Sequence, residues 1–329
     1  MDNLNSDIRV IAVVPAYKVS RHIVGVVQDA LRHCHHVIVI DDCCPQQSGK
    51  LVIDAKLGDD VTVIFNQVNL GVGGAVMAGY VFAVKNLDAT VIVKIDGDGQ
   101  MDCSLIPDFI APILRSEADY TKGNRFFDLR QLGQMPKIRI FGNAVLSLMA
   151  KLSTGYWDIF DPTNGYTAIH ADVARRLPFD KISNRYFFET DVLFRLNTLR
   201  AAVVDVPMDA IYADEVSNLR IRKIAGEFLL KHLRNGVKRI FYNYYLRDMS
   251  VASFELLIGL ILIAFGGTFG GLHWLSSSRM SQATPVGTIM ITAVCAIWGM
   301  QLLLAFISAD ISNVPRRAIH RSTIRLSIP

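Results

Sequence analysis

Two long uncharged stretches near the carboxyl end constrain this chain more than any other feature. No Asp, Glu, Lys or Arg occurs from Leu256 to Leu275, nor again from Met280 to Ala309. A helix needs about 20 apolar residues to cross a lipid bilayer. Each stretch is long enough, and the short segment Ser276–Arg279 lies between them. The pattern therefore predicts a two-helix hairpin that spans a membrane, and a buried helix pair in a soluble core is the weaker interpretation.

Basic residues flank this hairpin on both sides. Lys and Arg cluster between residues 220 and 247 and again between 316 and 325, whereas the linker holds only Arg279. Positive flanks stay on the cytoplasmic side. We therefore expect a protein of the inner (cytoplasmic) membrane with two spans, whose large amino-terminal domain and both termini are cytoplasmic. The net charge of +4 reflects these clusters, so we expect the membrane and no nucleic acid as a partner.

The residues before the spans alternate short apolar runs with helical patterns. VIAVVPAY, HVIVIDD, DVTVIFN and TVIVKIDGDG read as strands, with helices near 21–33 and 73–86 between them. Such alternation predicts a parallel α/β sheet covered on both faces. Ligands bind such sheets outside the carboxyl ends of the strands. We divide the chain into a globular domain (1–217), an amphipathic juxtamembrane region (218–250), two spans (251–310) and a basic tail (311–329).

The stretch HCHHVIVIDDCCP, residues 33–45, first suggests a zinc or redox site. Its histidines precede the predicted strand and its cysteines follow it. An extended chain rises about 3.3 Å per residue, so His36 and Cys43 are expected roughly 20 Å apart, too far to share one metal ion. The two aspartates at the strand end, Asp41 and Asp42, are the more informative residues.

The strongest local signal is VIVKIDGDGQ, residues 91–100. An apolar strand ends in Asp96-Gly97-Asp98-Gly99-Gln100. Two carboxylates separated by one glycine can converge on a ligand, and oxygen ligands suit Mg²⁺ or Mn²⁺ bridged to substrate phosphates. A polar turn after a strand is the plainer alternative. The position at the carboxyl end of a strand favours a metal site.

A second signal is NLGVGGAVMAGY, residues 69–80. Its glycines allow the backbone to approach a phosphate or a ribose, and the following helix start favours an anion. Glycines also serve close helix–sheet packing, so this signal is weak by itself. The first strand is followed by PAYKVS rather than a glycine fingerprint, which argues against NAD binding.

Seven motifs in order carry a resemblance. VVPAY, IDDCCP, NLGVGGAVMAG, KIDGDGQ, KGNRF, DPTNGYTAI and FFETDVLFRL resemble those of GT-A-fold, family 2 glycosyltransferases. With the hairpin, the chain resembles the polyprenyl-phosphate glycosyltransferases, the group that includes dolichol-phosphate mannose synthase and bacterial GtrB-type enzymes. The resemblance implies an α/β fold of the GT-A type, a Rossmann-like nucleotide-diphospho-sugar transferase domain, followed by an interfacial amphipathic helix and the two spans.

The resemblance also implies roles for individual residues. The metal ion, Mg²⁺ or Mn²⁺, would be held by Asp96, Asp98 and Gln100, with Asp98 favoured as the direct ligand. Candidate carboxylates at the reacting centre are Asp161, Asp191 and Asp98, with Glu189 a weaker candidate. The family often has small residues where this chain has Cys43 and Cys44. The nucleotide would contact Pro15, Ala16, Tyr17, Asp41, Asp42, Asn69, Gly71, Gly74 and Asp96, and the acceptor phosphate Arg125, Arg139, Arg220 and Arg222.

The implied activity is inverting transfer of a single sugar from a UDP- or GDP-sugar to a polyprenyl phosphate, with a divalent metal ion. An ionised phosphate acceptor needs no strong general base, whereas a hydroxyl acceptor would. Transfer to a hydroxyl of a lipid-linked saccharide, as in O-antigen or capsule assembly, stays open. So do a non-enzymatic membrane scaffold that binds nucleotides and a homo-oligomeric state. The sequence does not name the sugar.

Two segments have the composition of helices that lie on a membrane surface. Residues 218–248 mix Lys and Arg with Leu, Ile, Phe and Tyr at near-helical spacing, directly before the first span. Residues 136–153 are also amphipathic, and we expect this helix to dock at the membrane so that Arg139 meets the lipid phosphate. A soluble helix packed on the core is the alternative for each.

Overall fold

The computed structural model describes residues 8–127, 137–209 and 221–321, and it divides into two compact units. One unit comprises Met1–Gly236 with Pro315–Pro329, and the other comprises Val237–Val314. This division is coarser than the four predicted segments. Most of the amphipathic region and the basic tail group with the globular domain. Arg139, Arg220 and Arg222 have no described side chains, so their predicted roles lie outside what the structure describes.

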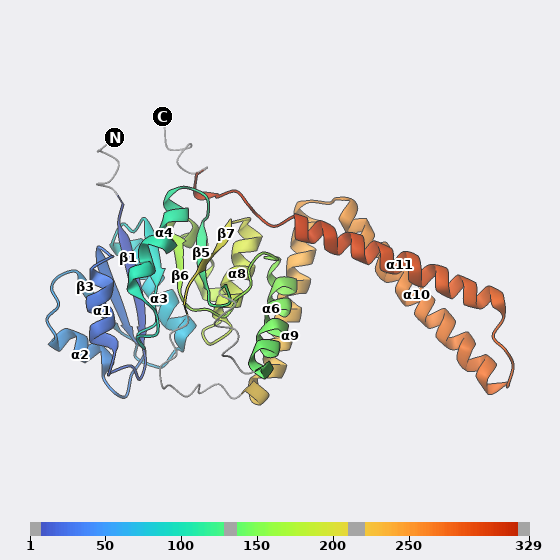
Figure 1. The fold of residues 1–329 in the computed structure, drawn as a ribbon, viewed down its shortest axis with the longest axis horizontal. Coiled ribbons are helices and arrows are strands. Elements are labelled where there is room, and N and C mark those ends of the chain that lie inside the picture. Colours follow the sequence, from blue (N-terminus) through green and yellow to red (C-terminus); the bar gives the residue numbers. More distant parts are fainter. Residues whose placement is uncertain (1–7, 128–136, 210–220, 322–329) are drawn as a thin grey trace. The chain divides into compact units, whose positions relative to one another are not determined.

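The first unit is built on one seven-stranded sheet, with strands in the order β3-β2-β1-β4-β6-β5-β7 (Figure 1). Strands β1 to β4 are mutually parallel where they pair, and β5 pairs in parallel with β7. Their bounds are Val10–Ala16 (β1), His36–Asp41 (β2), Val61–Phe65 (β3), Val91–Lys94 (β4), Tyr120–Asn124 (β5), Thr167–His170 (β6) and Val203–Pro207 (β7).

Strand β6 runs antiparallel to both of its neighbours, β4 and β5. The sheet is therefore mixed, and it differs at this strand from the parallel sheet that the sequence predicted. The chain enters β6 from the edge where the other strands end, so it must run back through the sheet. This reversal brings the segment before Thr167 to the carboxyl edge of the sheet, where ligands bind in α/β folds.

Helices cover both faces of this sheet. Helix α1 (Ile23–Leu31) and helix α4 (Ile106–Leu114) bury apolar side chains against Val10, Ala12, Val14 and the alternate positions of β2 and β4. Helix α3 (Val72–Asn86) packs on the opposite face, where Gly79 touches Val13. Shorter elements are α2 (Ser48–Asp54), η1 (Cys103–Leu105), α7 (Ala171–Ala174) and η2 (Phe179–Lys181).

The predicted strands and helices are confirmed where the sequence named them. The near-continuous burial of β1, β2 and β4 is that of parallel strands covered on both faces. The helix expected near 21–33 spans Ile23–Leu31, and buries Ile23, Val26, Val27 and Ala30 at the spacing of one helical face. Strand β2 places His36 and Asp41 at its opposite ends, as the argument against a shared metal requires.

Two longer helices and the first part of a third, through Gly236, complete this unit. Helix α6 (Lys137–Thr154), helix α8 (Phe188–Leu199) and helix α9 (Ile221–Phe241) lie at the end of the sheet where β5 and β7 are found, and α6 and α9 run side by side (Figure 1). A hydrogen bond of 2.8 Å joins Ser153 Oγ of α6 to His232 Nδ1 of α9. Both side chains are buried.

The basic tail returns to the globular unit and docks on it. The backbone N–H groups of Ile319 and His320 donate to the carboxylate of Asp119, and His320 Nδ1 lies 2.7 Å from Asp119 Oδ1. The ring of His320 stacks on that of His170, with centroids 4.1 Å apart. Asp119 is fully buried at the start of β5. The described tail residues from Pro315 to Arg321 are therefore part of the fold of this unit.

The second unit is a helical hairpin. Helix α10 (Val251–Arg279) and helix α11 (Val286–Ser312) are both long and apolar enough to cross a membrane, with mean hydropathies of 2.0 and 2.1. Gly259 faces Gly299, and a Cβ on Gly259 would lie 3.1 Å from the Gly299 carbonyl oxygen. Small residues that allow two backbones to approach closely are typical of helix pairs in membranes.

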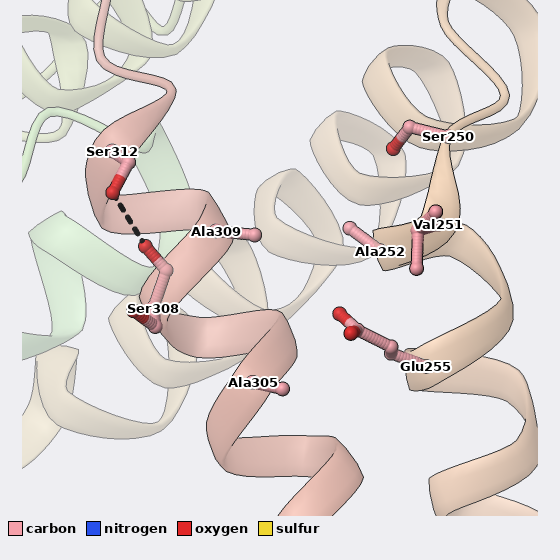
Figure 2. Close-up of a pocket in the computed structure, with 8 residues that line it drawn as sticks. All are labelled: Ser250, Val251, Ala252, Glu255, Ala305, Ser308, Ala309 and Ser312. Carbon is pink, nitrogen blue, oxygen red and sulfur yellow. Dashed lines mark hydrogen bonds between the residues drawn. The ribbon is translucent and has the colours of Figure 1, made fainter.

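The base of the hairpin carries polar groups. A short π-helix, η3 (Tyr242–Arg247), precedes α10. Arg239 forms two bonds, of 2.6 and 2.9 Å, with the Asp310 carboxylate, which also accepts the Tyr244 hydroxyl at 2.7 Å. Beside it, Glu255 points from α10 toward α11 across a groove of about 560 Å³ that small side chains line, among them Ala305, Ser308 and Ser312 (Figure 2).

Candidate active site

The carboxyl ends of β1, β2 and β4 bring three predicted segments to one edge of the sheet. Ala16 pairs with Asp41 across β1 and β2, and the Asp42 N–H donates to the Ala16 carbonyl at 3.1 Å. Tyr17 follows β1 with an exposed ring, and Asp96 comes two residues after the end of β4. These three segments therefore lie at the edge where ligands bind in such sheets.

Asp41 and Asp42 hold the loops that follow β2 and β3. Asp41 is buried and accepts the N–H groups of Cys44 and Gly49, each at 2.7 Å. Asp42 is also buried and accepts the N–H groups of Leu70 and Gly71 at 2.9 and 2.8 Å. Two carboxylates that collect backbone donors in this way fix the conformation of these loops. Contact with a nucleotide stays a prediction for both.

The glycine-rich segment packs closely against a distant loop. Gly71 begins α3 with a φ of +88°, a conformation that favours glycine. A Cβ on Gly73 would overlap the Ser183 carbonyl oxygen, and the Gly74 N–H donates to the Asn184 carbonyl at 3.0 Å. Close packing thus explains Gly73 and Gly74. The side chain of Asn69 donates to the Asp42 carbonyl at 3.2 Å, so it belongs to the same loop.

The two cysteines after β2 differ in their surroundings. Cys43 is exposed, with a φ of +54°. Cys44 is buried, and its sulfur accepts the Lys18 N–H at 3.1 Å and lies 3.2 Å from Ser48 Oγ. Burial opposes ionisation of this thiol, but hydrogen bonds from Ser48, Lys18 and Gln46 outweigh it and lower its pKa. Cys44 therefore ties the loop after β1 to the loop after β2.

The segment after β4 presents two carboxylates and an amide. Asp96 forms an ion pair of 2.6 Å with Lys94, whose side chain is almost fully buried. Asp98 accepts the Gln100 N–H at 3.0 Å. No cluster of three His, Cys, Asp or Glu suited to a metal occurs among the residues that the structure describes. Because Mg²⁺ is usually bound by one or two carboxylates together with substrate phosphates, Asp96 and Asp98 fit that ion.

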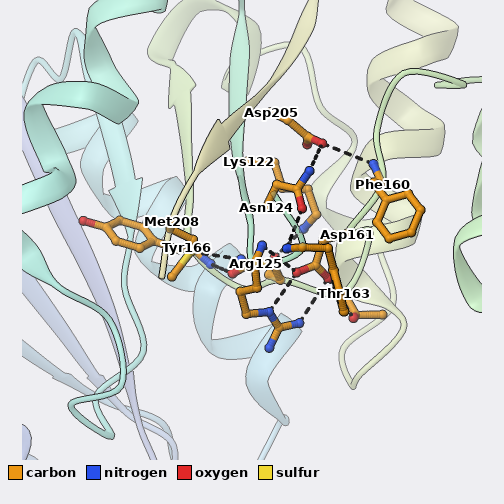
Figure 3. A network of polar contacts seen from close by, with 11 residues as sticks. Lys122, Asn124, Arg125, Phe160, Asp161, Thr163, Tyr166, Asp205 and Met208 are labelled. Carbon is orange, nitrogen blue, oxygen red and sulfur yellow. Dashed lines mark hydrogen bonds and ion pairs between the residues drawn. The ribbon is translucent and has the colours of Figure 1, made fainter. Parts of the chain in front are cut away.

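Arg125 and Asp161, predicted for separate roles, are bound to each other (Figure 3). Arg125 Nε and Nη2 donate to the two oxygens of Asp161 at 2.8 and 3.0 Å. The Asp161 side chain is only 2% exposed, whereas that of Arg125 is 31% exposed. The Thr163 hydroxyl also reaches Asp161, at 3.4 Å. Asp161 therefore orients a guanidinium group that faces solvent with part of its surface.

A buried polar group behind this pair was not predicted from the sequence (Figure 3). Asp205 Oδ2 accepts Asn124 Nδ2 at 2.9 Å and the Phe160 N–H at 3.2 Å, while Oδ1 has no partner among the described residues. Burial raises the pKa of Asp205 to about 6. Lys122 donates to the Asn164 carbonyl. A lone Asp in VVDVP gave no usable signal, because its partners come from β5 and the loop before β6.

Two buried lysines lie on the same face of the sheet. Lys94 and Lys122 both align with Thr167 of β6, from its two sides. Burial lowers the pKa of Lys122, although carboxylates including Glu189 oppose the effect. Burial raises the pKa of Glu189, and the two lysines oppose it. The sequence offered one signal for the cluster of Lys94, Lys122 and Glu189. It is the lysine inside the apolar run VIVKID, because a buried charge needs a partner.

Asp191 lies in helix α8 and uses both of its oxygens within the protein. Oδ2 accepts the Ser183 N–H at 2.9 Å, and Oδ1 accepts Asn235 Nδ2 of α9 at 3.0 Å. The side chain is buried. In this geometry Asp191 links the loop at Ser183 to helix α9. Its predicted part in the reaction stays a prediction.

Comparison with known proteins agrees with this fold. Residues 11–177 match Glycosyl transferase family 2, and the chain belongs to that family. It is therefore a glycosyltransferase with a GT-A fold. A crystal structure of glucosyl-3-phosphoglycerate synthase from Mycobacterium tuberculosis with Mg²⁺ and UDP superposes with a TM-score of 0.51, at 16% identity, over 70% of this chain and 79% of that chain.

Two curated relatives are similar over most of their length. Undecaprenyl-phosphate mannosyltransferase from Micrococcus luteus is 26% identical over 235 residues, which cover 70% of this chain and 94% of the relative. UDP-N-acetylglucosamine–dolichyl-phosphate N-acetylglucosaminyltransferase from Methanococcus voltae is 26% identical over 216 residues, which cover 61% of this chain and 85% of the relative.

Proposed function

We propose that this chain transfers one sugar from a nucleoside diphosphate sugar, UDP- or GDP-linked, to a polyprenyl phosphate at a membrane surface. The observation that carries the proposal is the Arg125–Asp161 pair, in which Arg125 directly follows β5 at the same carboxyl edge of the sheet where Asp96 and Asp98 follow β4. This edge thus carries both a partly exposed cation and carboxylates suited to a metal ion. The names of both curated relatives, which differ in the sugar, support a lipid phosphate as the acceptor.

The donor nucleotide is assigned to the edge of the sheet at the ends of β1 and β2, beside the glycine-rich loop. The proposed contacts are those of the sequence analysis, and the buried carboxylates of Asp41 and Asp42 keep their loops in place. A divalent cation bound by Asp98 and Asp96, with Gln100 nearby, would offset the negative charge that develops on the departing diphosphate. The Mg²⁺ and UDP in the M. tuberculosis structure support this class of donor and ion.

The acceptor needs orientation more than activation. A lipid phosphate is largely ionised near neutral pH, because the second pKa of a phosphate monoester is about 6. Arg125 presents a guanidinium group, whose planar fork suits phosphate oxygens. Asp161 holds that group in place rather than acting as a base, because both of its oxygens already accept from Arg125. One displacement on the sugar would invert its anomeric configuration. Arg139, Arg220 and Arg222 stay candidates for further phosphate contacts.

Apolar stripes on α6 and α9 support a membrane location for this site. Phe141, Leu148 and Leu152 of α6 and Leu230 and Leu233 of α9 are exposed, at 46–72% of their surface. The two helices lie side by side. Exposed apolar faces beside Lys and Arg are typical of helices at a lipid interface. Because the tail docks on the globular unit, both flanks of the hairpin belong on one side of the membrane, and the basic flanks make it the cytoplasmic side.

Transfer can be measured with the purified full chain in lipid nanodiscs. The assay supplies radiolabelled UDP- and GDP-sugars, Mg²⁺ or Mn²⁺, and undecaprenyl phosphate. We expect label in a lipid product that mild acid hydrolyses, as expected of a glycosyl phosphodiester. Label that enters only a lipid-linked saccharide would assign a hydroxyl acceptor instead, and no product with any donor would favour a nucleotide-binding scaffold.

A matched pair of variants tests the metal assignment in the same assay. Asp98→Asn should abolish transfer, whereas Asp59→Asn, an exposed residue just before β3 at the far edge of the sheet, should not change it. Binding of Mn²⁺ in the presence of UDP or GDP, followed by electron paramagnetic resonance, should weaken in Asp98→Asn only. Turnover at the wild-type rate in Asp98→Asn would refute the assignment.

A further inference from the structure

Helix α9 joins the globular unit through polar residues that are buried beneath its apolar stripe. His232 and Asn235 are 6% and 7% exposed, while Leu230 and Leu233 on the same helix are 66% and 62% exposed. Asn235 Nδ2 donates to Asp191 Oδ1 at 3.0 Å. A helix that only needed to be anchored would be held as well by apolar contacts, since a buried carboxylate has a high cost of desolvation. The bond from Asn235 to Asp191 therefore calls for another explanation.

Asp191 connects this helix to the loop that precedes α8. Its second oxygen, Oδ2, accepts the Ser183 N–H at 2.9 Å. The next residue, Asn184, accepts the Gly74 N–H on its carbonyl at 3.0 Å. Gly73 leaves no room for a side chain, because a Cβ there would overlap the Ser183 carbonyl oxygen and lie 2.6 Å from Phe188 Cβ. A shift of Ser183 must therefore move the start of α3.

The same start of α3 is held from its other side by Asp42. The Leu70 and Gly71 N–H groups donate to the Asp42 carboxylate at 2.9 and 2.8 Å. The glycine-rich loop is thus fixed between Asp42 and the segment Ser183–Asn184. Three hydrogen bonds, none longer than 3.0 Å, link α9 through Asp191 and the segment Ser183–Asn184 to the loop assigned to the donor nucleotide, and two more hold that loop to Asp42.

We propose that Asp191 is a positioning residue that couples helix α9 to the glycine-rich loop, so that the placement of α9 against the lipid surface sets the affinity of the donor site. The inference rests on the proposed function both for the donor site and for the membrane-facing position of α9. It gives Asp191 a role different from that of a proton acceptor. The coupling acts through the two hydrogen bonds of one carboxylate, which moves as a rigid group.

An exchange of the two partners tests this coupling. Asn235→Leu removes the hydrogen bond between Asn235 and Asp191, and Asp191→Asn weakens it by removing the charge of the acceptor. In the double variant D191N/N235D, the amide introduced at position 191 can accept from the Ser183 N–H with its oxygen. Its N–H can donate to the carboxylate introduced at position 235, so both hydrogen bonds can form again. Ser153→Ala is the matched control, because it removes the bond between α6 and α9 without touching Asp191.

Two readouts on the full chain in nanodiscs separate the possible results. Hydrogen–deuterium exchange of the peptide containing residues 69–80 should rise in Asn235→Leu and Asp191→Asn, and return toward the wild-type rate in D191N/N235D. Dissociation constants for UDP and GDP should rise about two-fold to thirty-fold in the single variants, the range of coupling through a contact network, with the same recovery. The KM for the donor should follow them, while kcat changes little.

Other results would overturn the proposal in distinguishable ways. Unchanged exchange at residues 69–80 in both single variants would refute the coupling. An Asp191→Asn variant with normal nucleotide affinity and a large loss of kcat, not recovered in D191N/N235D, would make Asp191 a reacting group. If the exchange rates behave as expected but neither UDP nor GDP binds to the wild-type chain, the coupling stands and the donor assignment of the proposed function fails.

Discussion

The pair of Arg125 and Asp161 makes a quantitative prediction about stability. Asp161 is 2% exposed and takes two hydrogen bonds from Arg125, at 2.8 and 3.0 Å. Replacing Arg125 with Met keeps much of its volume but leaves a buried carboxylate without its cation. Loss of one partner from a buried ion pair costs about 3–5 kcal/mol. For a unit of this size, 1 kcal/mol shifts the melting temperature by about 2–4 °C, so Arg125→Met should melt about 6–20 °C lower.

The reverse substitution should cost less, because the two partners differ in exposure. Arg125 is 31% exposed and can exchange its lost bonds for water, so Asp161→Asn should cost about 1–3 kcal/mol. The double variant R125M/D161N has no stranded charge and should melt above Arg125→Met alone. Circular dichroism of the detergent-solubilised chain measures all three melting temperatures. A double variant that melts at the sum of the two single losses would refute the reasoning.

The same variants separate two roles for Asp161 in turnover. If Asp161 only orients Arg125, Asp161→Asn should mainly raise the KM for undecaprenyl phosphate, as Arg125→Met does more strongly. If Asp161 takes a proton, Asp161→Asn should lower kcat and leave that KM unchanged. Initial rates at several acceptor concentrations decide between them, and a pure loss of kcat would contradict the orienting role.

Three further predictions concern a buried histidine, the docked tail and the two cysteines after β2. Burial lowers the pKa of His232 to about 4, whereas a histidine in the unfolded chain titrates near 6.5. The neutral His232 side chain therefore contributes its full stabilisation above pH 6.5, and this contribution is lost as the pH falls toward 4. The melting temperature of His232→Gln should accordingly fall less between pH 7 and pH 4.5 than that of the wild type. Asp119→Ala should release the docked tail, detected as faster tryptic cleavage at Arg317; equal cleavage rates would argue against docking. Iodoacetamide should label the exposed Cys43 well before the buried Cys44, which peptide mass spectrometry checks.

The sequence predicted the parts of the fold in which hydrophobic pattern and secondary structure coincide. Strands β1 to β4 and the hairpin are of this kind, because burial on two faces or contact with lipid leaves a continuous apolar run. Strand β5 reads YTKGN and is fully buried, yet its polar residues conceal it. Its Lys122 and Asn124 are satisfied by groups distant in sequence, Asn164 and Asp205. Such strands are defined by their partners rather than by their own pattern.

The residues of the candidate site fall into the same two groups: those next to strands that the sequence identified, and those whose positions depend on partners distant in sequence. The rule that ligands bind at the carboxyl ends of parallel strands pointed to the edge where Asp42 follows β2 and Asp96 follows β4, because those strands could be identified in the sequence. Ligand contact by either residue stays a prediction. The position of Asp161 followed only from the resemblance to a family, since no local pattern indicates that β6 runs antiparallel and returns the chain to that edge. The contacts of Asp191 with Ser183 and Asn235 depend on the packing of three separate segments.

The buried charges around the site follow from one constraint. Lys94 and Lys122 lie in strands that have no access to water, so the fold must place carboxylates near them, and Asp96 and Glu189 meet that need. The same carboxylate of Asp96 is proposed to hold a divalent cation. A bound cation would compete with Lys94 for Asp96, and the rest of the cluster would have to absorb the change in charge. Burial raises the pKa of Glu189 while the two lysines oppose it, so the charge of Glu189 depends on the charges around it.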